Sequence, residues 1–257
     1  MGMGEVKVKY HFLLGGYDLE MVEIRQLLEA NLQKFTDLGL SWGARLSAYH
    51  DLFNDDEHFV GIELTEDVTL PLHYTSIDHH NENSHRPSAI EQVAELLGIE
   101  LTRYQLLVAA NDSGYIPGME AMGASKADIE EIRQADRKAQ GVTEDDEELA
   151  KLSIRENLTQ VGALHIVEAK TPRFSAITDR LYPYRNLLIT FRNQLVFYGE
   201  GKEKLVKDFY WMISKGQAFH GGNETGFFGL VSDAFSEKET IEIRNKIIKL
   251  LTEATHV

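Results

Sequence analysis

The 257-residue chain contains no cysteine. This absence excludes disulfide bonds, thiolate zinc sites and cysteine nucleophiles, so a bound metal would need histidine, aspartate and glutamate ligands. The chain also lacks an apolar run close to the roughly 18–20 residues that cross a bilayer, and it begins without a secretory leader pattern. We therefore expect a cytoplasmic protein that has no membrane-spanning segment.

Basic residues are scarce relative to acidic ones. The formal net charge is −15, and no block of five or more lysines and arginines occurs. Such a chain repels the backbone of long nucleic acid unless one face is strongly basic. Negative charge also aids solubility, and by itself that is the commoner reason for it. We expect a small phosphoester or nucleotide as the partner, with no long nucleic acid and no membrane; a homodimer is left open.

The apolar pattern predicts an α/β fold. Hydrophobic residues make up 43% of the chain, which allows a substantial core. Apolar segments at 6–12, 59–64 and 74–77 have strand character, and capping boxes at Ser88 and Thr102 start helices. Alternating strands and helices favour a parallel, Rossmann-like sheet, and ligands bind such sheets at the carboxyl ends of the strands.

The second half of the chain differs in composition. Residues 125–157 are highly charged at helical spacing, and a further cap stands at Thr143, so we predict a helical connector. Strands over 163–167, 187–191 and 195–198 follow, with helices over 204–213 and from Ser236 to about Glu253. The predicted organisation is an N-terminal domain over 1–120, a connector over 121–160, and a smaller α/β domain with a mixed sheet over 161–257.

Chemistry-bearing residues gather where predicted strands and helices meet loops. Asp78-His79-His80 directly follows the strand over 74–77, and acidic residues stand at three further junctions: Asp18 with Glu20, Glu63, and Asp112. Side chains at successive strand ends of a parallel sheet converge in space although they are distant in sequence. Two imidazoles beside four carboxylates suit a site for two metal ions.

These residues resemble the motifs of the DHH phosphoesterases, which include RecJ-type exonucleases, nano-RNA and cyclic-dinucleotide phosphodiesterases, and manganese-dependent pyrophosphatases. The family's first motif, Asp-x-Asp, corresponds to Asp18-Leu19-Glu20, and its third to Asp78-His79-His80. Its second motif, an acid after an apolar strand, corresponds to Glu63. Its fourth corresponds to Asp112, which is followed by serine and glycine.

The resemblance implies a DHH catalytic domain and hydrolysis of a phosphodiester or phosphoanhydride in a small nucleotide-like substrate by water activated between two metal ions. It implies Mn²⁺ or Mg²⁺ as cofactor, with Asp78 orienting an imidazole and His80 contacting the phosphate or protonating the leaving oxygen. The implied metal ligands are Asp18, Glu20, Glu63, His79 and Asp112.

The resemblance extends to the second domain, which in this family usually carries a glycine-rich segment with a histidine. His220-Gly221-Gly222 is similar to that segment and implies substrate contacts. Arg173 and Arg180 are further candidates, because arginine suits bidentate phosphate binding. A surface or ion-pairing role for both arginines, and a simple turn for the glycines, are the alternative interpretations.

Several alternatives stay open for the first domain as well. Asp18 and Glu20 would also serve as helix caps, and Asp112 would also fit an Asn-Asp-Ser-Gly turn. Glu66 and Asp67 compete with Glu63 as the second-motif acid.

The first motif departs from the family pattern. Family members usually carry another ligand just before the first-motif acids, where this chain has Leu14, Gly15 and Gly16. A nucleotide-binding module without turnover is therefore one alternative function, and a short-oligonucleotide exonuclease is another. A metal-binding structural protein ranks last.

Overall fold

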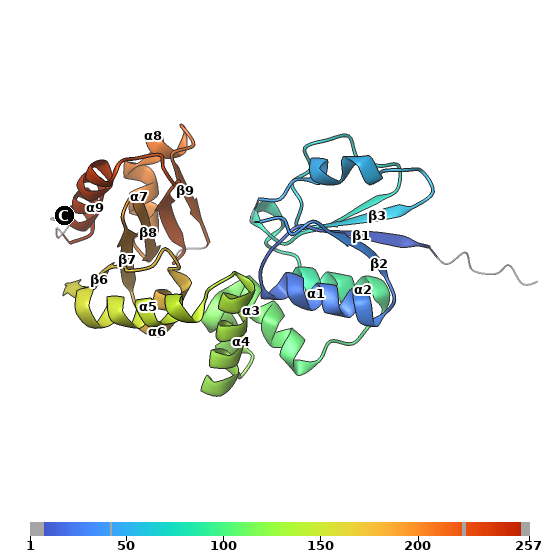
Figure 1. The fold of residues 1–257 in the computed structure, drawn as a ribbon, viewed down its shortest axis with the longest axis horizontal. Helices are drawn as coiled ribbons and strands as arrows, with labels where there is room; N and C mark the ends of the chain where they lie inside the picture. The colour runs from blue at the N-terminus through green and yellow to red at the C-terminus, as the bar shows by residue number, and fades with distance from the viewer. Residues whose placement is uncertain (1–7, 42, 223–224, 253–257) are drawn as a thin grey trace, which may run out of the picture. The chain divides into compact units, whose positions relative to one another are not determined.

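The computed structural model describes residues 8–41, 43–222 and 225–252. The chain forms two compact units, Met1–Gly141 and Val142–Val257 (Figure 1). Each unit combines one β-sheet with helices, so the predicted α/β fold class is confirmed. No helix among the described residues is long and apolar enough to cross a membrane.

The first unit is built on a four-stranded sheet in the order β2-β1-β3-β4, and every pair of neighbours is parallel. Leu14, Ile62 and Ile77 are aligned in register at the last positions of β1, β3 and β4. Three of the strands therefore end side by side, and the loops that follow them begin at one edge of the sheet. The strands are β1 (Tyr10–Leu14), β2 (Lys34–Asp37), β3 (His58–Ile62) and β4 (Tyr74–Ile77).

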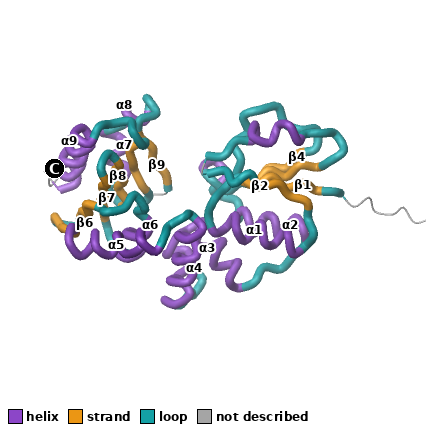
Figure 2. The backbone as a smooth tube through the Cα atoms, viewed as in Figure 1, coloured by secondary structure: helices purple, strands orange, loops and turns teal. Residues whose placement is uncertain are grey.

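The helices of this unit cover one face of the sheet, and a 3₁₀ segment covers the other (Figures 1 and 2). Phe12 and Leu14 pack against α1 and α2, whereas Leu13, on the opposite face, packs with Leu46 and Tyr49 of the 3₁₀ segment. Burial of both faces explains why β1 is apolar throughout. The helical segments are α1 (Leu19–Ala30), the 3₁₀ helices Leu46–Leu52 and Asn81–Asn83, α2 (Ala89–Leu97), α3 (Arg103–Ala121) and α4 (Lys126–Ala139).

The predicted helix starts are confirmed at Ser88, Thr102 and Thr143, each of which forms a reciprocal capping box. The first strand differs from the prediction. Val6 lies outside the described residues, and β1 continues to Leu14, so that the turn begins only at Gly15. The 3₁₀ helices and β2 were not predicted, because their apolar pattern is short and irregular.

The predicted connector over 121–160 divides between the two units. Helix α4 belongs to the first unit, where it packs against α1 and α3, and α5 belongs to the second, where it packs against α6 and β6. The sequence suggested one solvated connector, but each helix buries one face in its own unit. Charged residues at helical spacing do not indicate which sheet a helix packs on. In α4 the buried positions include Arg133 and Asp136, which the sequence pattern presents as solvent-exposed.

Helix α3 continues through Asp112 and is kinked at Tyr115, whose φ and ψ are 55° and −148°. Pro117 follows the kink, and its ring and missing N–H prevent a regular helix at this point. Asp112 is thus a helical residue, and the alternative of an Asn-Asp-Ser-Gly turn does not apply.

The second unit is built on a six-stranded mixed sheet in the order β5-β6-β7-β8-β10-β9, in which only β6 and β7 pair in parallel. Helices α7, α8 and α9 pack on one face and α5 and α6 on the other. The strands are β5 (Leu158–Val161), β6 (Leu164–Glu168), β7 (Asn186–Phe191), β8 (Gln194–Gly199), β9 (Ala218–Gly221) and β10 (Phe227–Leu230). The helices are α5 (Glu144–Asn157), α6 (Ser175–Leu181), α7 (Lys202–Asp208), α8 (Tyr210–Ile213) and α9 (Glu237–Thr252).

The predicted hairpin of β7 and β8 is present, with Arg192 and Asn193 at its turn. The final helix is also confirmed as far as Thr252, and Glu253 lies outside the described residues. The helix predicted over 204–213 is interrupted at Phe209. Strands β9 and β10 were missed, because glycines interrupt their apolar pattern.

Candidate metal centre

The strand register of the first unit brings the candidate ligands together. Glu63 is the first residue after β3, and its N–H donates to the carbonyl of Ile77, 2.8 Å away, at the end of β4. His79 follows two residues after that strand, and Glu20 lies in the first turn of α1. Residues that are far apart in sequence therefore meet at the carboxyl edge of the parallel sheet, as expected from the strand pattern.

A strained backbone position aims Glu63 into the site. Its φ is +53°, in the left-handed region that non-glycine residues seldom adopt. Gly15 makes this arrangement possible, because a Cβ there would lie 2.4 Å from the carbonyl oxygen of Ile62 and 2.5 Å from that of Glu63. The glycine after β1 thus allows the chain after β3 to approach closely.

Three carboxylates surround one imidazole nitrogen. His79 Nε2 lies 2.6 Å from Asp112 Oδ2, 3.3 Å from Glu63 Oε1 and 3.6 Å from Glu20 Oε2. All four atoms are buried, and none has a hydrogen-bond partner of acceptable geometry among the described residues. Buried polar atoms without partners are rare in folded proteins. Oxygen and imidazole donors that converge in this way fit a divalent cation, which would satisfy all of them at once.

His80 lies beside this cluster and is more exposed. Its Nδ1 is 3.8 Å from Glu63 Oε1, and Glu63, His79, His80 and Asp112 each offer a donor atom within 4.8 Å of the others. Asp78 Oδ1 accepts a hydrogen bond from the N–H of His80 and lies 3.2 Å from its Nδ1, while Oδ2 accepts one from Asn83. The imidazole that Asp78 contacts is therefore that of His80, and His79 faces the carboxylates.

Asp18 combines a helix cap with a place at the centre. Its Oδ1 accepts a hydrogen bond from the N–H of Met21 at 2.9 Å, so the capping interpretation holds for this oxygen. Its other oxygen is directed towards Gly16, where a Cβ would lie 3.5 Å from Asp18 Oδ2 and 3.2 Å from Glu63 Oε2. The absence of a side chain at Gly16 leaves space beside these two oxygens.

Burial and neighbouring charges shift the pKa values of the ionisable groups at the centre. Burial, reinforced by Asp112 and Glu63, raises the pKa of Asp18 to about 7. Burial also raises the pKa of Glu20 to about 8, against the opposing effect of His79. Burial alone would lower the pKa of His79, but the neighbouring carboxylates raise it to about 12. The metal-free centre therefore holds protons at neutral pH, and cation binding must displace them.

The pKa of Asp78 is shifted in the opposite direction. Its burial would raise the pKa, but hydrogen bonds from Asn83 and His80 hold the pKa below its ordinary value. A carboxylate that stays ionised keeps its interaction with the His80 ring over the neutral range, so the orientation of that ring does not depend on protonation of Asp78.

Glu63, rather than Glu66 or Asp67, is the second-strand acid that faces His79. Asp67 instead accepts hydrogen bonds from the N–H and hydroxyl of Ser47, at 2.9 and 2.8 Å, on the other side of the loop. Glu66 is exposed. Of these three acids, Glu63 is the one whose carboxylate lies beside His79, at 3.3 Å, and its role as a metal ligand stays a prediction.

Sequence reasoning missed a buried polar network from α4 that supports the centre. Asp136 Oδ1 accepts a hydrogen bond from the N–H of Leu19, between Asp18 and Glu20, at 3.2 Å. Arg133 donates to Asp136 at 2.7 Å and to Asn111, the neighbour of Asp112, at 2.8 Å. One ion pair of α4 therefore holds the two segments that carry Asp18 and Asp112. The network is distinguished from ordinary helix-surface pairs only by the burial of Arg133 and Asp136, and burial cannot be read from the sequence.

The remaining candidates, Arg173, Arg180, His220, Gly221 and Gly222, belong to the second unit. Arg180 donates to the carbonyl of Ala176 at 2.6 Å and lies 2.5 Å from Glu147, so its guanidinium is engaged within the unit. Arg173 and His220 are exposed. Substrate contacts by these residues stay a prediction.

The glycines of this unit meet a packing requirement. A Cβ on Gly221 would lie 2.5 Å from the ring of Phe227, and Gly222 has a φ of +71°. Buried Lys202 donates to the carbonyl of Gly222 at 2.8 Å. Packing against Phe227 and the left-handed φ of Gly222 explain these glycines without a ligand, and His220 lies within β9.

At the sequence level, no protein-family model and no curated protein matches the chain. Among solved structures, the chain is similar to the pGpG-specific phosphodiesterase PggH from Vibrio cholerae, with 16% sequence identity and a TM-score of 0.47, over 96% of this chain and 100% of that chain. It is also similar to the DHH domain of a protein described as a member of a ribosomal protein family, with 12% identity and a TM-score of 0.46, over 96% of this chain and 76% of that chain.

Proposed function

We propose that the protein is a divergent DHH phosphoesterase that hydrolyses a phosphodiester or phosphoanhydride in a small nucleotide-like substrate, with Mn²⁺ or Mg²⁺ as cofactor. The observation that carries this proposal is the convergence of Glu20, Glu63 and Asp112 on Nε2 of His79, with all four atoms buried and without hydrogen bonds. Protonated His79 offsets only part of the charge of three carboxylates, and a bound divalent cation would balance the rest.

The orientation of Glu63 supports two cation positions. Its Oε1 faces His79, and its Oε2 lies beside Gly16 with Asp18 Oδ2. The first position would be held by Glu20, Glu63, His79 and Asp112. Among the described residues, the second would be held by Asp18 and Glu63, because Leu14 is buried in the core and Gly15 and Gly16 have no side chains. We expect the second cation to bind more weakly and to take its remaining ligands from water or the substrate.

The roles of the residues follow from their positions. When bound, the cations would supply a water molecule of lowered pKa and offset charge on the phosphoryl oxygens. Hydrolysis breaks the bond between phosphorus and the leaving oxygen, and that oxygen must gain a proton. His80 is the exposed imidazole at the centre, and Asp78 fixes its ring. His80 is therefore the group that donates this proton or contacts the phosphate.

The proposal is tested by substrate cleavage in the presence of Mn²⁺ and Mg²⁺. The panel comprises linear and cyclic dinucleotides, short oligonucleotides, pyrophosphate and a chromogenic phosphodiester. We expect turnover that chelation removes and that His79→Ala lowers by at least ~100-fold, since a metal ligand is lost. Preference for oligonucleotides over dinucleotides would favour the exonuclease alternative.

A matched histidine variant is the control. His50 is an exposed residue of the 3₁₀ segment Leu46–Leu52, with 67% of its side chain accessible, and His50→Ala should leave turnover unchanged. Turnover that survives both chelation and His79→Ala would contradict the proposal.

The second candidate function is nucleotide binding without turnover. The observation in its favour is that Leu14, Gly15 and Gly16 offer no side-chain ligand. One of the two cation positions therefore has fewer ligands from the chain. Under this alternative, nucleotide binds and no substrate of the panel is cleaved with either metal.

A further inference from the structure

Helix α3 carries a strained residue three positions after Asp112. Tyr115 has a φ of 55° and a ψ of −148°, a combination that is almost confined to glycine. The neighbouring Gly114 would adopt it at little cost, yet the φ of Gly114 is not positive. Pro117 explains why the regular helix ends, since it lacks an N–H, but it does not require a positive φ two residues earlier. Contacts elsewhere in the fold therefore hold Tyr115 in this conformation.

The chain after the kink is packed against the first part of α3. A Cβ on Gly118 would lie 2.4 Å from the carbonyl oxygen of Ala110, so no side chain fits at this position without movement of the backbone. Ile116 and Met119 are buried. The direction of the chain after the kink is thus set by packing, and the backbone of Tyr115 takes up the change in direction.

The ring of Tyr115 lies on a buried cation. The guanidinium carbon of Arg133 is 4.6 Å from the centre of the ring, and the side chain of Arg133 is only 8% exposed. A cation–π contact is stronger where water is excluded. The same guanidinium donates to Asp136 at 2.7 Å and to Asn111 at 2.8 Å. The ring therefore covers one face of the guanidinium, while N–H groups in its plane bind the two oxygen atoms.

One partner of Arg133 adjoins an acid of the candidate metal centre. Asn111 is buried, and it immediately precedes Asp112, whose Oδ2 lies 2.6 Å from His79 Nε2. A change in the position of Asn111 would also move the backbone of Asp112. The contact between the ring and Arg133 therefore affects the carboxylate that faces His79.

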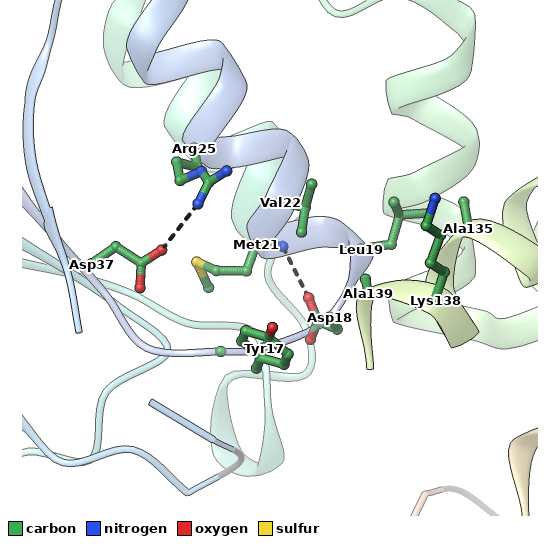
Figure 3. Close-up of a pocket in the computed structure, with 11 residues that line it drawn as sticks. Tyr17, Asp18, Leu19, Met21, Val22, Arg25, Asp37, Ala135, Lys138 and Ala139 are labelled. Carbon is green, nitrogen blue, oxygen red and sulfur yellow. Dashed lines mark hydrogen bonds and ion pairs between the residues drawn. The ribbon is translucent and has the colours of Figure 1, made fainter. Parts of the chain in front are cut away.

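The other partner, Asp136, reaches the acids at the start of α1. Its Oδ1 accepts a hydrogen bond from the N–H of Leu19, 3.2 Å away, and Leu19 stands between Asp18 and Glu20. Residues of α4 line a pocket together with Asp18 and Leu19, so this helix lies directly against the turn (Figure 3). A shift of Arg133 would therefore reach the first turn of α1 through Asp136.

We propose that Tyr115 is a positioning residue of the metal centre. Its ring holds the guanidinium of Arg133, and that guanidinium keeps the segments that carry Asp112 and Glu20 at the separation that a shared cation requires. The contact with Arg133 offsets the strain in the backbone of Tyr115. This inference rests on the proposed function, and it gives a role to a residue that bears no metal-binding group itself.

The first measurement is amide hydrogen exchange at Leu19, followed by NMR in chelator-treated protein of full length. Tyr115→Leu removes the ring and keeps an apolar side chain. We expect the amide of Leu19 to exchange about 10-fold faster in this variant, because its acceptor Asp136 is held less firmly. Tyr115→Phe keeps the ring and should stay within about 2-fold of wild type. Equal acceleration at Leu19 and at Val60, in the centre of the sheet, would indicate lower overall stability and would contradict the proposal.

Tyr104→Leu is the matched control, because Tyr104 is a half-buried tyrosine in the first turn of the same helix. It should leave the exchange rate of Leu19 unchanged. The control removes the same side chain from α3 at a position that is distant in sequence from the kink, so it isolates the contribution of the ring on Arg133.

The second measurement is the affinity for Mn²⁺, determined by calorimetry. We expect Tyr115→Leu to weaken binding about 10-fold, and Tyr115→Phe and Tyr104→Leu to leave it unchanged. The loss in the double variant Tyr115→Leu/Asp136→Asn should be smaller than the two single losses combined, because both substitutions act through Arg133. Fully additive losses would contradict coupling through Arg133.

These measurements separate the role of Tyr115 from the proposed function. Wild-type protein that binds Mn²⁺ but cleaves no substrate of the panel would contradict the proposed function and leave the comparison of affinities intact. An unchanged exchange rate at Leu19, or an unchanged Mn²⁺ affinity, in Tyr115→Leu protein would overturn the positioning role whatever the protein cleaves.

Discussion

The candidate functional residues of the two units differ in how their charges are balanced. In the first unit, one carboxylate oxygen each of Glu20, Glu63 and Asp112 is buried beside Nε2 of His79, and none of these four atoms has a hydrogen bond of acceptable geometry. In the second, Arg180 donates to the carbonyl of Ala176 and pairs with Glu147, one cation with one carboxylate, and Gly221 packs against the ring of Phe227. Three carboxylates against one imidazole leave negative charge unbalanced in a buried place, whereas an arginine paired with one glutamate is balanced. The first unit therefore carries the stronger indication of a ligand.

The pH dependence of stability is the sharpest way to test this difference, and it should give the largest effect. Asp18, Glu20 and His79 all have folded-state pKa values above their ordinary ones. The folded protein then binds more protons than the unfolded chain, from about pH 4 to 8 through the two acids and above about pH 6.5 through His79, so its stability is lost as pH rises. We expect the unfolding free energy of chelator-treated protein to fall by on the order of 3 kcal/mol from pH 5 to 8.5, measured by denaturant titration.

Two further measurements, on Glu20→Gln protein and with added Mn²⁺, distinguish titration of the centre from a general effect of the net charge. Glu20→Gln should flatten the slope, because one of the titrating groups is removed. Mn²⁺ should oppose the slope, since its ligands must be deprotonated and its affinity therefore increases with pH. An identical slope in wild-type and Glu20→Gln protein, with no influence of Mn²⁺, would show that the first unit is no different from the second.

The supporting network of α4 gives a smaller effect. Asp136→Asn weakens the ion pair with Arg133 and the hydrogen bond from the N–H of Leu19. Leu19 lies between Asp18 and Glu20, so these two acids are then held less firmly. We expect Mn²⁺ affinity, measured by calorimetry, to fall about 10-fold, as for other residues that orient metal ligands.

Asp128→Asn is the control for that variant, because Asp128 is on the same helix and interacts with the helix cap and with Arg103. It should leave Mn²⁺ affinity unchanged. If both variants lose stability equally and neither loses metal affinity, α4 supports the fold and not the centre.

The smallest effect concerns the second unit. Arg180→Met removes the pair with Glu147, and the partly buried site should cost about 1 kcal/mol of unfolding free energy. We expect turnover and KM to stay within about 2-fold of wild type, because the guanidinium is already engaged. Arg155→Met, on the exposed face of α5, is the control for loss of charge. An increase in KM specific to Arg180→Met would show that the second unit binds substrate through this residue, as the suitability of arginine for phosphate binding predicts.

Much of the fold could be predicted because its signals are local. Ser88, Thr102 and Thr143 cap helices through side chains three residues away, and the β7–β8 hairpin closes over a two-residue turn. The missed elements lack such signals. Strands β9 and β10 are interrupted by glycines, and α4 and α5 have similar charge patterns although they pack in different units.

The candidate site divides in the same way. The sequence by itself determined that a parallel sheet presents Asp18, Glu63 and Asp78-His79-His80 at its carboxyl edge, because strand ends are marked by the change from apolar to polar residues. Only the tertiary structure decided which side chains meet. The left-handed turn at Glu63 excludes Glu66 and Asp67, Asp78 contacts His80 and not His79, and α4 supplies Asp136. Those outcomes depend on backbone direction and on burial by distant segments, which local residue patterns do not encode.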